Sequence, residues 1–151
     1  MKLIDALVIT ALSAALLPAQ TPAPAASLKT FASSADVQAL IAKAKSEHKD
    51  GQAIVTEPIL QFAPYTATLE YRASAGAAAV HPDQAEMMYV IEGSGTLVTG
   101  GKLTGKTIEG GESRTVSKGD FLVVPEGTPH WFSAVNPTLV LMTFKAPRGA
   151  K

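Results

Sequence analysis

After residue 52, the sequence consists of short apolar or β-branched segments separated by glycine, proline and asparagine turns. The clearest segment, residues 65–72, alternates apolar and polar side chains in the way a half-buried strand does. Similar segments cover residues 53–62, 87–91, 96–99, 113–117, 121–124, 130–135 and 138–144, with a glycine-punctuated excursion at 100–111. Many short strands of this kind are typical of a small sandwich or barrel, so the pattern predicts an all-β fold.

One amphipathic helix is predicted ahead of the strands, over residues 34–48. Ser33 or Ser34 can cap it with a hydroxyl, and Asp36 suits its positive N-terminal end. Apolar residues follow the three-and-four spacing of one stripe at Val37, Leu40, Ile41 and Ala44. We therefore expect an N-terminal helical segment at 27–52, packed on the outside of a β-barrel formed by residues 53–147.

Residues 1–26 are predicted to be a signal peptide followed by an alanine- and proline-rich linker. Lys2 precedes an apolar stretch at 6–17, and three prolines between residues 18 and 24 stop that stretch from extending as a helix. The stretch is too short to span a bilayer. We expect a periplasmic or secreted protein whose mature form has no membrane association. The alternative is an alanine-rich N-terminus that is disordered or buried.

Charge and cysteine content exclude several classes of protein. Thirteen Lys and Arg residues balance 13 Asp and Glu residues, which argues against a nucleic-acid-binding protein. The chain has no cysteine, so disulfides, thiolate nucleophiles and cysteine metal ligands are excluded. Any metal site must therefore use nitrogen and oxygen ligands.

Only three histidines are present, and two of them stand at the start of predicted strands. His48 falls at the end of the predicted helix among charged residues, where a solvated role is expected. His81 comes shortly before Glu86, which opens an apolar strand, and His130 opens another. If these side chains converge inside a barrel, two imidazoles and a carboxylate suit a divalent transition metal with open positions for substrate or dioxygen.

At these residues the sequence resembles the cupin family. The spacing His81, four residues, Glu86, six residues, Gly93 matches the second half of the first cupin motif. The second motif is matched without a gap at Gly119, Pro125, Gly127 and His130. The two motifs and their link cover residues 76–136. The resemblance implies a jelly-roll barrel, also called a double-stranded β-helix, with one helix ahead of it.

The first motif departs from the family pattern at one position. Its first histidine would stand at residue 79, which is Ala79. The resemblance therefore implies a set of three metal ligands, His81, Glu86 and His130, for Fe, Mn, Ni, Co or Zn. It also implies chemistry on a small organic molecule, of dioxygenase, isomerase or lyase type. If the metal has been lost, His81 and Glu86 would instead form an acid–base pair in the cup.

The lining of the cup follows from strand parity. With Glu86 and His130 pointing inward, we expect an apolar lining from Met88, Val90, Phe121, Val123 and Phe132. Arg72 could hold a substrate carboxylate if its face of the strand lines the barrel, whereas the alternative is a solvated outer face.

Two other functions compete with a metal-dependent enzyme. The first is a non-catalytic periplasmic cupin that binds a small molecule without a functional metal, which the alanine at position 79 favours. The second is an interaction module or homodimer, for which Tyr65, Tyr71 and Trp131 could supply the surface.

Overall fold

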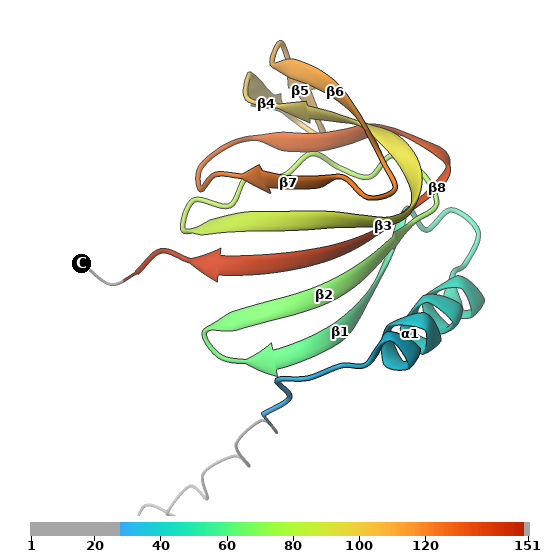
Figure 1. Ribbon diagram of the computed structural model, residues 1–151. Coiled ribbons are helices and arrows are strands. Elements are labelled where there is room, and N and C mark those ends of the chain that lie inside the picture. The colour runs from blue at the N-terminus through green and yellow to red at the C-terminus, as the bar shows by residue number, and fades with distance from the viewer. Residues whose placement is uncertain (1–27, 150–151) are drawn as a thin grey trace, which may run out of the picture.

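The computed structural model describes residues 28–149, which contain one helix and eight strands (Figure 1). In chain order they are α1 (Ser34–Glu47), β1 (Ile54–Phe62), β2 (Tyr65–Arg72), β3 (Gln84–Thr99), β4 (Lys102–Thr104), β5 (Thr107–Glu109), β6 (Glu112–Ser117), β7 (Phe121–Val124) and β8 (His130–Pro147). The all-β fold with one N-terminal helix is confirmed. The expected signal peptide and linker, residues 1–26, lie outside the described residues.

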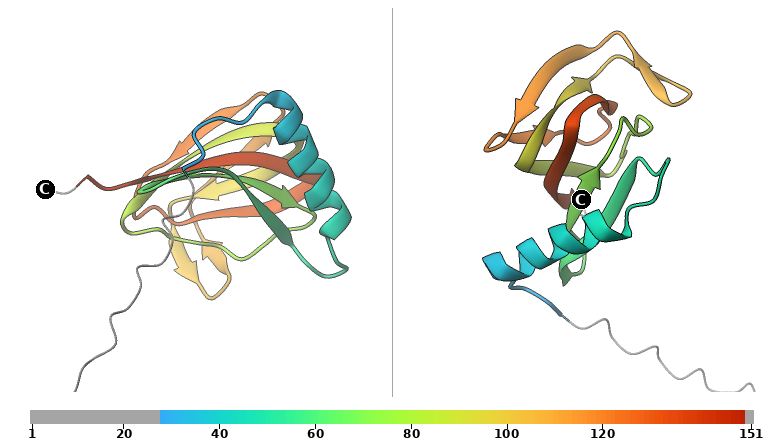
Figure 2. Two further views of the ribbon diagram at one scale, coloured as in Figure 1. Left: turned by 90° about the horizontal axis from the view of Figure 1, so that it is seen from below. Right: turned by 90° about the vertical axis from the view of Figure 1, so that its right-hand side faces the viewer.

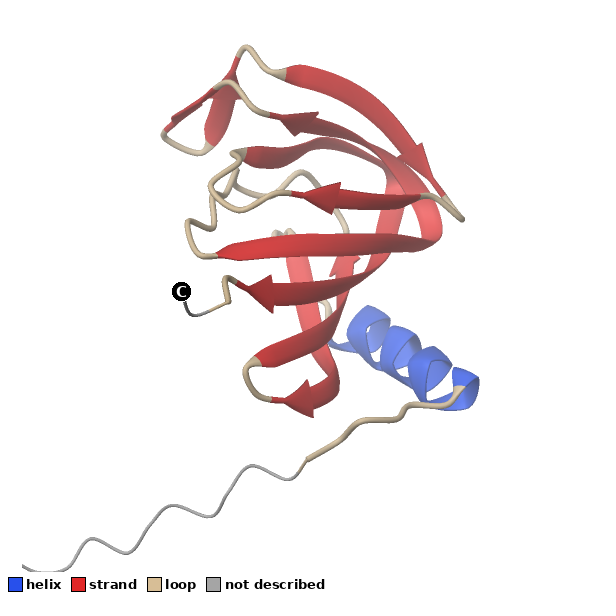
Figure 3. Ribbon diagram, turned by 60° about the vertical axis from the view of Figure 1, so that its left-hand side comes forward, coloured by secondary structure: helices blue, strands red, loops and turns tan. Residues whose placement is uncertain are grey.

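All strand pairs in the barrel are antiparallel. The order across the main sheet is β1-β2-β8-β3-β6, with β7 also paired to β3, while β4 and β5 form a separate two-stranded ribbon. The long strands β3 and β8 pair from Gln84↔Pro147 to Thr99↔His130. This β3–β8 ribbon curls back on itself, so that the two halves of the sheet face each other across the interior of the barrel (Figures 1 and 3).

The strands β3 and β8 are longer than the sequence pattern predicts. We expected separate strands at 87–91 and 96–99, and again at 130–135 and 138–144, but each pair is one continuous strand. Gly93 and Gly95 do not form a turn between two strands. They lie at or next to register shifts in the pairing of β3 with β8. Gly93 has a φ of +76°, and a Cβ atom there would overlap the carbonyl oxygen of Thr138. The glycine therefore allows a bulge at which the ribbon bends.

Two apolar cores lie on opposite faces of the curved sheet. The inner core fills the barrel and consists of Met88, Val90, Leu97, Val116, Val124, Phe132, Leu139 and Leu141. The outer core lies between α1 and the sheet and consists of Ile41, Ala44, Val55, Ile59, Ala67, Leu69 and Val140. The alternation in β2 explains this arrangement, because Ala67 and Leu69 face the helix while Thr68 and Glu70 face the interior.

Helix α1 lies across the outer face of β1 and β2 (Figure 2). A capping box starts it: the Ser33 hydroxyl accepts from the Asp36 N–H at 3.1 Å, and the Asp36 carboxylate accepts from the Ser33 N–H at 2.8 Å. His48 is its C-terminal cap and accordingly lies outside the barrel. Within residues 28–149, no helix has the length and apolar content needed to cross a membrane.

The interior positions expected for Phe121 and Val123 are wrong. Both side chains are on the outer surface, 64% and 53% exposed. In the antiparallel β3–β7 pair, Glu86 stands opposite Val124 and Met88 opposite Leu122. Residues directly opposite each other point to the same face, so Val124 and Leu122 line the interior and their neighbours on β7 point out. The other expected lining residues, Met88, Val90 and Phe132, are buried inside the barrel.

Candidate metal centre

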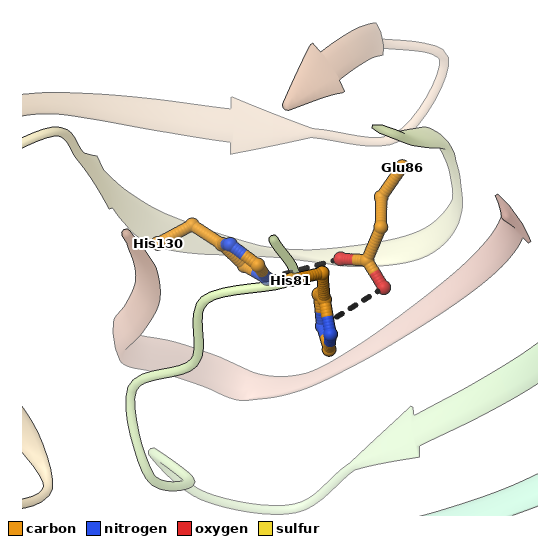
Figure 4. Close-up of side chains that lie close together, drawn as sticks. All are labelled: His81, Glu86 and His130. Carbon is orange, nitrogen blue, oxygen red and sulfur yellow. Dashed lines mark ion pairs between the residues drawn. The ribbon is translucent and has the colours of Figure 1, made fainter. Parts of the chain in front are cut away.

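The side chains of His81, Glu86 and His130 meet at one point inside the barrel (Figure 4). The Nε2 atom of His130 is 3.0 Å from Oε2 of Glu86, and the Nε2 atom of His81 is 3.3 Å from Oε1 of the same carboxylate. The three ligand atoms lie within 4.8 Å of one another. Glu86 and His130 are buried, whereas His81 is partly exposed, so the cluster opens to solvent on the side of His81.

The curl of the β3–β8 ribbon brings these residues together. Glu86 is near the start of β3 and pairs with Lys145, while His130 pairs with Thr99 at the opposite end of the ribbon. His81 belongs to the segment between β2 and β3, and this segment is tied to the loop before β8 by backbone hydrogen bonds. Gly127 N–H donates to the carbonyl of His81 at 2.7 Å, and residue 79 exchanges two bonds of 2.9 Å with His130.

A tight turn aims His130 into the barrel. The turn runs from Pro125 to Thr128, whose N–H donates to the Pro125 carbonyl at 3.2 Å. Gly127, the third residue, has a φ of +70°, a conformation that glycine adopts without strain. This explains why the second motif spaces its proline, glycine and histidine as it does.

The second ring nitrogen of His130 fixes its orientation. Nδ1 lies 3.1 Å from the carbonyl oxygen of Thr128, to which it can only donate. In a neutral ring this leaves the lone pair on Nε2, which faces the Glu86 carboxylate at 3.0 Å. Both atoms carry lone pairs and repel each other at this distance unless a cation lies between them. That cation is either a proton on Nε2 or a metal ion that binds both atoms.

The electrostatics of the cluster favour an ionised carboxylate and a neutral His81. Burial would raise the pKa of Glu86, but the hydrogen bond and charge of His130, followed by those of Lys145, lower it to about 2. Desolvation lowers the pKa of His81 below 6.5, and the opposing attraction of Glu86 does not cancel this effect. Metal ligation needs an ionised Glu86 and a neutral His81, but the lowering of the Glu86 pKa comes mainly from a protonated His130, whose proton the ion would replace.

Lys145 is a residue at the centre that the sequence reasoning missed. Its Nζ atom is 3.1 Å from Oε1 of Glu86, and its side chain is 31% exposed. Counting in twos along β8 from His130 places residue 145 on the outer face. The register shifts in the β3–β8 ladder reverse that parity, so Leu139, Leu141, Thr143 and Lys145 follow Phe132 on the inner face. No signal in the sequence marks this reversal except the Asn136-Pro137 pair.

Arg72 and Glu70 also face the interior, which settles between the two alternatives left open by the sequence. Glu70 Oε2 accepts from Nε and Nη2 of Arg72 at 3.0 and 2.6 Å, and both side chains are largely buried. The Arg72 guanidinium lies 4.7 Å from the centre of the Phe132 ring. Arg72 is therefore an interior residue whose charge is already neutralised by Glu70.

The donor set fits a divalent transition metal. Two nitrogens and a carboxylate are common ligands for Fe, Mn, Co, Ni and Zn. Ligand atoms that lie about 2.1 Å from one ion are about 3.0 Å apart at a right angle and about 3.4 Å apart at the tetrahedral angle. The separations of the two imidazoles from Glu86, 3.0 Å to Oε2 and 3.3 Å to Oε1, lie in this range, with each imidazole next to a different carboxylate oxygen. Ala79, where the first motif has another histidine, supplies no ligand, so three protein ligands would hold the ion.

Solved structures of similar fold are known, although no curated protein sequence matches the chain. KdgF from Halomonas sp. is 24% identical with a TM-score of 0.52, and the match covers 69% of this chain and 90% of KdgF. BH2720 from Bacillus halodurans is 18% identical with a TM-score of 0.55 and 86% coverage of both chains. HppE with Fe(II) is 17% identical with a TM-score of 0.55, covering 63% of this chain and 52% of HppE. Likeness at these identities shows a common fold.

The family comparison agrees with the fold and with the sequence motifs. The family described as Cupin domain matches residues 65–144, which is more than half of the chain. The matched range runs from β2 to the later part of β8 and includes His81, Glu86 and His130. This chain belongs to the cupin family.

Proposed function

We propose that this protein binds a divalent transition metal through His81, Glu86 and His130 and acts there on a small organic molecule. The observation that carries the proposal is the orientation of His130. Its Nδ1 is held by the Thr128 carbonyl, so that Nε2 faces the buried Glu86 carboxylate at a separation suited to two ligands of one ion. Among proteins of similar fold, HppE has been solved with Fe(II).

A divalent metal at this position would supply a Lewis acid that polarises a bound oxygen-containing group. The residues of the chain would bind and shield the substrate around it. Phe132, Val90 and Met88 form an apolar interior that excludes water. His81 and Lys145 are each about a third exposed, so a ligand would reach the ion from their side. The same site could serve a dioxygenase, an isomerase or a lyase, and the identity of the metal would separate these reactions.

Export to the periplasm or out of the cell is part of the proposal. It is supported by the sequence of residues 1–26, in which Lys2 precedes a short apolar stretch and several prolines. The homodimer expected from the sequence also stays a prediction.

A non-catalytic cupin without metal is the second candidate, and one observation favours it. The ammonium group of Lys145 lies 3.1 Å from Glu86 Oε1 and supplies a counter-charge for the carboxylate without any ion. Ala79 also leaves the site one histidine short of the family pattern. In this alternative the cup would bind a small molecule through its polar groups alone.

Metal content separates the two candidates. The protein is purified without an affinity tag, reloaded in turn with Fe(II), Mn(II), Co(II), Ni(II) and Zn(II), and analysed by elemental mass spectrometry. We expect about one ion per chain in the wild type and in the control His48→Ala, whose histidine lies outside the barrel. His130→Ala and Glu86→Gln should lose the ion. A wild type that stays metal-free after reloading would rule out the metal-dependent function.

A further inference from the structure

Lys145 gives the proposed metal centre an excess of positive charge. In the described structure its ammonium shares Oε1 of Glu86 with the imidazole of His81. A bound divalent ion would be coordinated by this same carboxylate of Glu86. Two positive charges of the ion and one of Lys145 would then face the single negative charge of Glu86, and a partly buried excess of this size is costly unless an anion balances it.

The other buried charges nearby do not balance this excess. Glu70 takes two hydrogen bonds from Arg72, so this pair is neutral as a unit. Within residues 28–149, Lys145 forms its ion pair with Glu86, the carboxylate that the metal would bind. An anionic ligand would supply the missing negative charge.

Threonines share the inner face of β2 and β8 with Lys145. On the inner face, Lys145 stands opposite Thr66, and the next inner residue of β8, Thr143, stands opposite Thr68. Among the described residues, the Thr143 hydroxyl is the buried side-chain polar atom without a hydrogen-bond partner. A hydroxyl without a partner is unfavourable in a packed interior, and Thr143 stands two residues before Lys145 on the same face of β8.

From these observations we infer that the ligand of this site is a small carboxylate, which Lys145 binds while the ligand contacts the metal. The inference rests on the proposed function, because without the ion Glu86 already balances Lys145. Lys145 would recognise the anion by a charge-assisted hydrogen bond, and the metal by direct contact. An apolar or purely cationic ligand would leave the charge of Lys145 uncompensated.

The test uses Co(II)-loaded full-length protein, with visible absorption of the cobalt as the signal. Oxalate is the anionic probe and imidazole is the neutral one. Lys145→Gln should weaken oxalate binding about tenfold or more, because glutamine keeps a polar side chain but lacks the charge of the ammonium. It should leave imidazole binding within about twofold. Lys145→Arg, which keeps the charge, should retain most of the oxalate affinity, and it also serves if Lys145→Gln fails to fold. The exposed Lys102→Gln is the matched control.

Three outcomes would overturn the inference, and they are distinguishable. Equal oxalate affinity in wild type and Lys145→Gln, with both loaded by Co(II), would refute the role of Lys145 and leave the metal site standing. A wild type that gives no cobalt absorption would refute the proposed function and this inference together. An equal loss of oxalate affinity in Lys145→Arg and Lys145→Gln would also refute recognition by charge.

Discussion

At the scale of single residues, Phe132 and Phe121 show how strongly one strand position determines what a side chain contributes. Both are phenylalanines on strands of the same barrel. Phe132 is 1% exposed within the inner core and lies under the Arg72 guanidinium, whereas Phe121 points to solvent. The inner-facing ring is therefore expected to stabilise the fold, and the outer-facing ring is not.

We predict that Phe132→Ala lowers the free energy of unfolding by about 3–5 kcal/mol, because it removes a buried ring and leaves a cavity. Phe121→Ala makes the same chemical change on the surface and should alter the free energy of unfolding by no more than about 0.5 kcal/mol. Urea unfolding of both variants followed by circular dichroism measures the difference. If both variants lose a similar free energy of unfolding, the side chain of Phe121 points into the barrel and not to the outer surface.

At the scale of elements, the start of α1 depends on two side chains. The pKa of Asp36 is below 3.8, mainly because the backbone N–H of Ser33 donates to its carboxylate and the Ser33 hydroxyl adds a second bond. A carboxylate whose folded pKa is lower than its unfolded pKa stabilises the fold above the unfolded value. That contribution is lost as the pH falls through the folded pKa.

Asp36→Asn should therefore be less stable than the wild type at neutral pH, by an amount that is constant above about pH 5 and shrinks below it. Unfolding by urea at a series of pH values measures this difference. Titration of the wild-type carboxyl by NMR gives an independent reading, in which the pKa of Asp36 lies below 3.8. A difference that grows on acidification would contradict the capping interaction.

The bend of the β3–β8 ribbon is a second feature at this scale, and it depends on Gly93. Gly93→Ala should lower the free energy of unfolding by about 3 kcal/mol or more. The substitution combines a positive φ with an overlap against the Thr138 backbone. Gly105 also has a positive φ, +62°, but open space around it, so Gly105→Ala should cost only about 1–2 kcal/mol. If both variants lose equal stability, the close approach of β8 to residue 93 is not what requires glycine.

At the scale of the whole molecule, the proposed metal centre joins parts of the chain that are far apart in sequence. A ligand that binds only the folded state stabilises it by mass action, by about 2.7 kcal/mol at a hundredfold excess over its dissociation constant. We predict a stabilisation of this order when Mn(II) or Co(II) is added to the wild type, measured by urea unfolding at fixed metal concentration. The metal should stabilise His130→Ala only slightly and His48→Ala as much as the wild type. If the metal stabilises all three proteins equally, the ion binds at another site.

Local patterns in the sequence were enough to predict the class of fold and the main residues of the candidate centre. Alternation in residues 65–72 and the stripe from Val37 to Ala44 report local backbone geometry, which neighbouring residues largely set. The spacings around His81, Glu86 and His130 resemble family motifs, because a turn or a strand start needs particular residues at fixed offsets. These features are local, and the helix, most of the strands and the cluster could be predicted from them.

Which groups face one another across the barrel depends on strand pairing and could not be predicted from the sequence. Glu86 and His130 stand at opposite ends of the β3–β8 ribbon, and they meet because the ribbon curls. The register shifts that allow the curl also reverse the side-chain parity, which brings Lys145 inside. The pairing of β7 with β3 turns Phe121 and Val123 outward. The facing of a strand depends on the register of its partner, a contact between distant residues that no local pattern in the sequence encodes.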